Sequence, residues 1–112
     1  MENGRQFNIR DEDGRNLCPA CGFPGYFDER SYGNRGGVIA TGICPCCQWE
    51  PGFDDSPTAS GAPATILEAL RQFRRRWPSD GLTWSGQPDQ MPSEWDGRAQ
   101  LDHLFRVAPY VR

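Results

Sequence analysis

The sequence predicts a small α+β domain, in which a β-hairpin between two cysteine-containing turns is packed by one well-defined helix and a weaker C-terminal helix. Three observations support this fold class. The chain has 112 residues, the size of one ordinary domain with a modest core. It contains 13 Gly and 10 Pro, which predicts many turns. Its five cysteines all fall between positions 18 and 47, where they form two short turns that can staple a small core.

We expect one domain over residues 1–112, built from three consecutive segments. Residues 1–16 are a polar lead-in, residues 17–77 hold the cysteines and the better helix, and residues 78–112 form a loop and helix extension. The lead-in has no apolar stretch typical of a secretory signal. Because the mean hydropathy is only −0.72, we also expect no membrane span. These features predict a cytoplasmic protein with reduced thiols.

The expected strands lie before and between the cysteine turns. Alternating apolar and polar residues predict a short strand near residues 6–10, followed by the turn signal Asp13-Gly14. Residues 25–32 and 38–43 are expected to pair as strands, joined by the glycine-rich tip at 33–37.

The clearest helix is predicted over residues 66–77. Thr65 and Glu68 have the spacing of a capping box, in which each side chain satisfies a free backbone N–H of the first turn. The helix has one apolar stripe, made of Ile66, Leu70, Phe73 and Trp77. A weaker helix is expected over residues 94–107, with Ser93 as its N-cap.

The cysteines carry the clearest chemical signal. Two Cys-Pro-x-Cys segments occur, and 22 residues separate Cys21 from Cys44. A two-residue spacer lets one tight turn direct both sulfurs at the same ion. Four thiolates from two such turns complete a tetrahedral shell suited to one Zn²⁺ per chain. The expected ligands are Cys18, Cys21, Cys44 and Cys47.

The sequence leaves alternatives open at this site. Cys46 is adjacent to Cys47, and we interpret it as a fifth thiol that does not bind the metal. Iron is the rival ion, because paired Cys-x-x-Cys turns also serve iron proteins. Zinc is favoured over iron because Gln48 replaces the Gly expected after the second turn. A redox or structural disulfide pair is the alternative to a metal, although an odd, clustered set of cysteines is not typical of a disulfide framework.

The cysteine turns are followed by an acidic pair and a helix start. The motifs are Cys18-Pro19-Ala20-Cys21-Gly22-Phe23, Ile43-Cys44-Pro45-Cys46-Cys47-Gln48-Trp49-Glu50, Asp54-Asp55 and Thr65-Ile66-Leu67-Glu68-Ala69 with Phe73. This combination, over about residues 17–75, resembles the cysteine-rich CPCC domain family of small bacterial proteins. The resemblance implies a zinc-ribbon-like hairpin with the same four metal ligands, and it implies no particular activity. The extra cysteine of that family falls at Ala20, whereas here it is Cys46.

The sequence gives no sign of catalysis. Glu50, Asp54 and Asp55 form an acidic cluster near the second cysteine turn, but carboxylates in loops are usually solvated or paired with Arg. Four cysteine ligands leave no open position at which a catalytic zinc would hold water. The chain has no nucleophile triad, phosphate-binding glycine loop or dinucleotide fingerprint. We therefore expect a protein that is not an enzyme.

Charge is distributed in blocks along a chain with a formal net charge of −3. Residues 48–65 sum to −3, residues 66–77 to +3 and residues 78–96 to −4. Such blocks favour recognition of a charged protein partner. Our hypothesis is a bacterial immunity protein that neutralises a basic toxin. The candidate partner-binding residues are Glu50, Asp54, Asp55, Arg71, Arg74 and Arg75.

The alternative function is a zinc-ribbon regulator that binds nucleic acid through its Arg-rich helix. Four Arg side chains on this helix can neutralise several phosphates; they are Arg71, Arg74, Arg75 and Arg76. However, the chain is acidic and contains no Lys, so it lacks the basic footprint of a general nucleic-acid binder. A protein partner is the preferred hypothesis.

Overall fold

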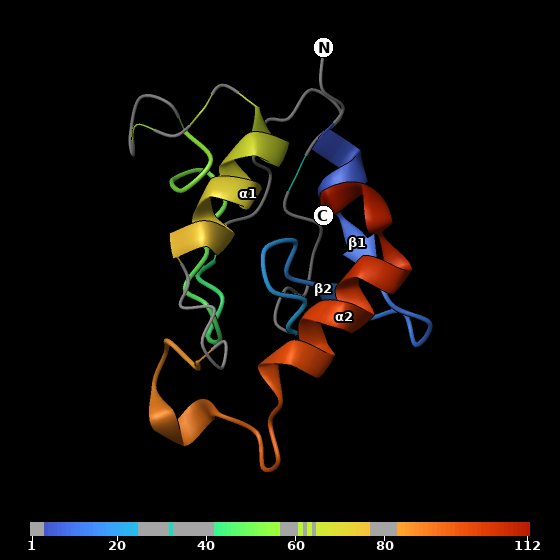
Figure 1. The fold of residues 1–112 in the computed structure, drawn as a ribbon, viewed down its shortest axis with the longest axis vertical. Helices are drawn as coiled ribbons and strands as arrows, with labels where there is room; N and C mark the ends of the chain where they lie inside the picture. Colours follow the sequence, from blue (N-terminus) through green and yellow to red (C-terminus); the bar gives the residue numbers. More distant parts are fainter. Residues whose placement is uncertain are drawn as a thin grey trace.

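The fold is described from a computed structural model of the chain. The structure describes residues 4–24, 32, 42–56, 61, 63, 65–76 and 83–112. The elements in chain order are a 3₁₀ helix over Gly4–Phe7, strands β1 (Ile9–Arg10) and β2 (Asn16–Leu17), helix α1 (Ile66–Arg76), a 3₁₀ helix over Pro88–Gln90, helix α2 (Gly97–Val107) and a 3₁₀ helix over Pro109–Val111. The loop that follows β2 lies between α1 and α2 (Figure 1). The α+β class, with an antiparallel hairpin and two helices, is confirmed.

The described hairpin lies before the first cysteine turn. β1 and β2 pair antiparallel, with Ile9 opposite Leu17 and Arg10 opposite Asn16. The strand predicted near residues 6–10 is therefore present only in its last two residues, because the residues before it form a 3₁₀ helix.

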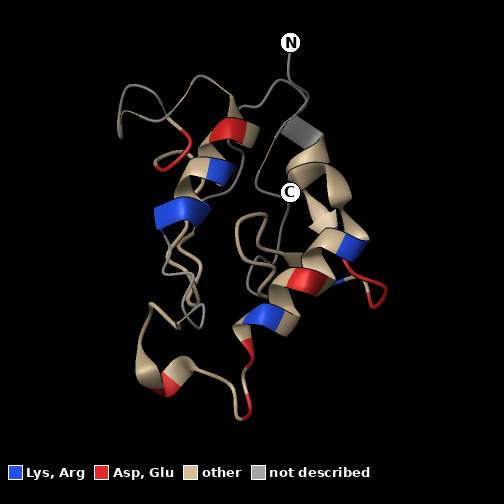
Figure 2. Cartoon of the chain, in the orientation of Figure 1, with Lys and Arg blue, Asp and Glu red and all other residues tan. Residues whose placement is uncertain are grey.

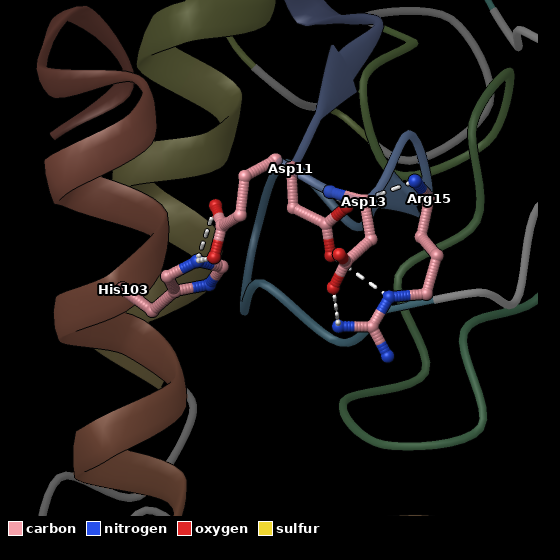
Figure 3. A network of polar contacts seen from close by, with 5 residues as sticks. Asp11, Asp13, Arg15 and His103 are labelled. Carbon is pink, nitrogen blue, oxygen red and sulfur yellow. Dashed lines mark hydrogen bonds and ion pairs between the residues drawn. The ribbon is translucent and has the colours of Figure 1, made fainter.

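The turn between β1 and β2 is organised by the Asp11 carboxylate (Figure 3). Its oxygens accept hydrogen bonds from the backbone N–H groups of Asp13 and Arg15, each at 2.9 Å, and from Arg15 Nε at 2.9 Å. Burial acts to raise the pKa of Asp11, but these hydrogen bonds outweigh burial and lower it. On the other side of the turn, Nε2 of His103 in α2 lies 3.2 Å from a carboxylate oxygen of the exposed Glu12.

The helix α1 forms where the sequence predicts it. The N–H of Glu68 donates to Thr65 Oγ1 at 3.2 Å, which confirms Thr65 as a cap of the first turn. Leu70 is fully buried. Phe73 packs edge-on against Trp49, with ring centroids 5.1 Å apart, so α1 is attached to the second cysteine turn. Trp77 of the predicted stripe lies outside the described residues.

The helix α2 is shorter than the sequence predicts. It begins at Gly97, and its N-cap is Asp96 rather than Ser93. The Asp96 carboxylate accepts hydrogen bonds from the N–H groups of Arg98 at 3.0 Å and Ala99 at 3.2 Å. Because Gly97 is the first helical residue, it does not interrupt the helix as it would in the interior.

The core extends from the cysteine turns towards both ends of the described chain. Phe7 and Ile9 are only 1% and 4% exposed, so the polar lead-in contributes to the same core as the cysteines. Near the other end, Leu104 and Val111 are fully buried.

Two further expectations concern parts of the chain that are only partly covered. The hairpin predicted over residues 25–43 lies outside the described residues, apart from Tyr32, Gly42 and Ile43. Among the described helices, none combines the length and apolar character needed to cross a membrane.

Candidate metal centre

The first cysteine turn is closed by backbone hydrogen bonds. The N–H of Cys18 donates to the Phe23 carbonyl at 3.0 Å, and the N–H of Gly22 donates to the Cys18 carbonyl at 2.8 Å. Gly22 has a φ of +88°, a conformation that glycine adopts without steric cost. A Cβ at this position would also lie 2.8 Å from the carbonyl oxygen of Gln100 on α2. Both the turn and the docked helix therefore require glycine here.

The second cysteine turn repeats this backbone pattern. The N–H of Cys44 donates to the Trp49 carbonyl, and the N–H of Gln48 donates to the Cys44 carbonyl, both at 2.9 Å. Gln48 has a φ of +73°, so it occupies the position that Gly22 fills in the first turn. Because the backbone of the turn is the same with Gln as with Gly, Gln48 gives no reason to favour zinc over iron.

The two turns bring the sulfurs of Cys18, Cys21, Cys44 and Cys47 within 4.8 Å of one another. The Sγ atoms of Cys18 and Cys47 are 3.8 Å apart, and those of Cys21 and Cys44 are 3.7 Å apart. Four Zn–S bonds of about 2.3 Å in a tetrahedron place the sulfurs about 3.8 Å apart. The group can therefore hold a metal ion. All the cysteines are free thiols, and Cys46 lies outside this group.

The sulfur group is closed to solvent, and its thiols contact one another. Cys18, Cys21 and Cys44 are fully buried, and Cys47 is 3% exposed. Burial and hydrogen bonds with neighbouring thiols raise the pKa of Cys21 and Cys47. Burial also acts to raise the pKa of Cys44, but hydrogen bonds with the other three thiols outweigh burial and lower it. Because a metal binds thiolates, any proton on these sulfurs must leave when the ion enters.

Residues from the C-terminal part of the chain surround both turns. Gln100 Nε2 donates to the Cys21 carbonyl at 3.1 Å and to Cys46 Sγ at 3.4 Å. The N–H of Ser85 donates to the Cys46 carbonyl at 2.8 Å. Sequence reasoning missed these residues, because a glutamine in a helix and a serine in a loop carry no local signal for contacts so distant in the chain.

The loop before α2 and the first residues of α2, residues 83–100, form a covering segment over the cysteine turns. Aromatic side chains hold this segment in place. Trp84 packs edge-on against Phe23 and Trp95, with ring centroids 5.4 and 5.5 Å apart. Trp95 Nε1 donates to Gln100 Oε1 at 2.9 Å. Gly86 lies so close to the second turn that a Cβ there would collide with the carbonyl oxygen of Pro45. The loop before α2 is therefore packed tightly onto the cysteine turns.

Arg74, a candidate partner-binding residue, is used inside the structure. Its guanidinium donates to the carbonyls of Pro19 at 2.6 Å, Ala20 at 2.7 Å and Val111 at 2.5 Å. It also lies over the Phe105 ring, 5.0 Å from the centroid. Burial lowers the pKa of Arg74 to about 10, while nearby cysteines act to raise it. The side chain therefore stays charged at neutral pH and joins the first turn to the C-terminal residues.

The acidic candidates form a structured turn after the second cysteine pair. Asp54 accepts a hydrogen bond from the N–H of Glu50 at 2.7 Å. Asp55 accepts from the hydroxyl of Tyr32 at 2.7 Å and from the N–H of Gly52 at 2.9 Å. Burial raises the pKa of Asp54. The two aspartates therefore make internal hydrogen bonds, and Glu50 is half-buried.

The remaining basic candidates, Arg71 and Arg75, also belong to α1. Arg71 forms an ion pair with Glu68 at 2.9 Å and donates to the Arg112 carbonyl at 3.0 Å. Arg75 is exposed. The structure does not bring these Arg side chains and the acidic turn together into one site with the sulfur group.

Fold and site together define a small α+β protein with a buried group of four cysteines that can hold a metal ion. The chain is 30% identical over 83 residues to the uncharacterized protein YozI of Bacillus subtilis (strain 168), in an alignment covering 69% of this chain and 67% of that protein. The chain belongs to the same family as YozI. No protein-family model and no solved structure matches the chain.

Proposed function

We propose that the protein is a non-enzymatic zinc-binding protein, in which zinc holds together a domain that binds another protein. The main support for this proposal is the group of four buried sulfurs within 4.8 Å of one another. Their number and spacing suit a closed tetrahedral site, which has no open position for water or substrate. The shared backbone pattern of the two turns supports a zinc-ribbon-like pair of knuckles. The same pattern supports our proposal that residues 17–75 form a domain of the CPCC type.

The position of Arg74 supports a thiolate site. A divalent ion with four thiolates has a net charge of about −2, and a buried charge is costly unless it is compensated. The Arg74 guanidinium donates to the Pro19 and Ala20 carbonyls inside the first Cys-x-x-Cys turn. A positive charge therefore lies beside the proposed ion, where it favours the deprotonated form of the cysteines.

The first experiment measures bound metal and its effect on folding. We expect one zinc per chain by mass spectrometry and a colourless protein. Chelation should abolish the helical circular dichroism signal, because structural zinc contributes on the order of 10 kcal/mol to folding. The matched variants are Cys21→Ser, which removes a ligand, and Cys46→Ser, which leaves all four. A chain that stays folded after complete metal removal would contradict the proposal, as would equal zinc loss in both variants.

The proposed partner surface is the exposed part of the loop before α2, over residues 87–94. Met91 is 46% exposed, and Asp89 and Glu94 are exposed beside it in sequence. The acidic residues of this loop lie at the opposite end of the view from the N-terminus (Figure 2). An acidic surface with an exposed apolar side chain suits a basic protein, and a toxin neutralised by an immunity protein is the form we propose.

The internal contacts of α1 favour this protein partner over nucleic acid. Arg74 donates to backbone carbonyls, and Arg71 is engaged with Glu68 and the Arg112 carbonyl. Phosphate contacts by either side chain would have to displace these bonds. Arg75 and Arg76 remain exposed, a smaller basic surface than the sequence indicated.

A pull-down of the zinc-loaded protein from native lysate, with and without nuclease, tests the partner. We expect one stoichiometric protein that survives nuclease treatment. The double variant Asp89→Lys with Glu94→Lys should lose it, whereas the charge change Asp102→Lys, at an exposed position of α2, should retain it. Loss of all partners on nuclease treatment would instead indicate nucleic-acid binding. Full retention by the double variant would place the surface elsewhere.

A further inference from the structure

Gln100 contacts both cysteine turns from outside. Its Nε2 donates to the carbonyl of Cys21 in the first turn at 3.1 Å and to the Sγ of Cys46 in the second turn at 3.4 Å. Its Oε1 accepts from Trp95 Nε1 at 2.9 Å. The amide therefore has partners for both of its polar atoms, and its orientation is fixed by an aromatic residue of the same segment.

Cys46 is a competitor for the metal. It is fully buried and adjacent in sequence to Cys47, and its thiol has the same chemistry as those of the ligand group. Yet its sulfur lies outside the group of four. The covering segment holds Cys46 through two hydrogen bonds. The Cys46 carbonyl accepts from the N–H of Ser85 at 2.8 Å, and the Cys46 sulfur accepts from Gln100 Nε2.

We propose that Gln100 is a positioning residue that keeps Cys46 out of the coordination shell and so makes Cys47 the fourth ligand. This inference rests on the metal centre proposed above and deepens it. If Cys46 turned towards the metal, one Nε2–H of the half-buried Gln100 side chain would lose its sulfur partner, and a donor left unpaired where water has little access is unfavourable. The Gln100 amide thus opposes the replacement of Cys47 by Cys46 as a metal ligand.

Cobalt substitution tests this, because the sulfur-to-cobalt charge-transfer absorption scales with the number of bound thiolates. The wild-type protein should show a four-thiolate spectrum. Cys47→Ser alone should lose about a quarter of this absorption, because Gln100 still holds Cys46 away. Cys47→Ser combined with Gln100→Met should recover the four-thiolate spectrum, because Cys46 is then released. Adding Cys46→Ser to this pair should remove the recovered absorption.

Two results would overturn the inference: a four-thiolate spectrum in Cys47→Ser with Gln100 intact, or no recovery when Gln100 is also changed. If the Gln100→Met chain does not fold, Gln100→Glu replaces it. That variant keeps an acceptor for Trp95 and the shape of the side chain, but an ionised carboxylate has no hydrogen to donate to Cys46. The proposed metal centre fails separately, if the wild-type chain binds no cobalt through four thiolates.

Discussion

Gly22→Ala should destabilise the zinc-loaded protein much more than Gln48→Ala, although the two residues occupy equivalent positions in the two cysteine turns. Both have a positive φ, +88° at Gly22 and +73° at Gln48. Because Gln48 has a side chain, the wild-type protein already includes the free-energy cost of placing a side chain in that conformation. The Gln48 side chain is also exposed. At Gly22, a new Cβ would lie 2.8 Å from the Gln100 carbonyl oxygen and 2.9 Å from Leu104 Cβ on α2.

The size of the effect follows from these two costs. The left-handed conformation costs an L-residue roughly 1 kcal/mol. Overpacking against a helix costs about 2 kcal/mol more, because the nearest atom is backbone and cannot rotate away. Gly22→Ala should therefore lose about 3 kcal/mol, which corresponds to a fall of roughly 12 °C in Tm. Gln48→Ala removes only the weak bond from its Nε2 to the Cys44 carbonyl at 3.3 Å and should lose about 0.5 kcal/mol.

Urea unfolding at saturating zinc, followed by tryptophan fluorescence, measures both variants. Zinc content should be determined on the same samples, so that loss of metal and loss of packing are separated. Equal destabilisation by the two substitutions would refute the reasoning, because the close approach of α2 would then contribute nothing. A wild-type midpoint for Gly22→Ala would refute it as well.

Three further predictions concern other parts of the structure. Arg74→Met leaves the carbonyls of Pro19, Ala20 and Val111 without this donor and should cost about 3 kcal/mol in urea unfolding; Arg75→Met, at an exposed position, should cost no more than about 0.5 kcal/mol. Asp96→Ala should cost about 1 kcal/mol by removing the N-cap of α2, whereas equal loss in Ser93→Ala would contradict this cap. Burial and the nearby Asp55 charge raise the pKa of Tyr32, so the folded protein keeps this proton after the unfolded chain has lost it. Stability should therefore fall as the pH rises above about 10, by up to about 1.4 kcal/mol per pH unit from this group. Tyr32→Phe should remove that component in urea titrations across this range, and an unchanged slope would count against it.

The features that the sequence predicts well depend on short-range patterns. The start of α1 follows from Thr65 and Glu68, three residues apart. The structure shows one of the two bonds of the expected capping box, from the Glu68 N–H to Thr65 Oγ1, while the Glu68 carboxylate accepts from Arg71. The four clustered sulfurs follow from two Cys-x-x-Cys spacings, because each spacer fixes one pair within a single turn. Each of these signals needs only a few neighbouring residues, whereas the approach of the two turns, which brings Cys18 to Cys47, depends on long-range packing.

The features that the sequence does not predict depend on long-range packing. The start of α2 is ambiguous locally, because Ser93 and Asp96 are both good N-caps and only the packed structure selects Asp96. Arg74 has the composition of a surface residue, yet its guanidinium is enclosed by backbone carbonyls. Gln100 has no pattern that indicates a contact with Cys21, 79 positions away.

The order of the cysteine turns and their covering segment along the chain has a consequence for how the protein is made. Both turns leave the ribosome before Ser85 and Gln100 do, and at 5–20 residues per second about 50 residues take several seconds to synthesise. During that interval the turns lack the contacts that Ser85 and Gln100 make in the folded chain, so we expect the sulfurs to be accessible to an ion. Once α2 docks, the same sulfurs are at most 3% exposed. We therefore expect each molecule to acquire its ion once, as a nascent chain, and to exchange it afterwards only when it unfolds.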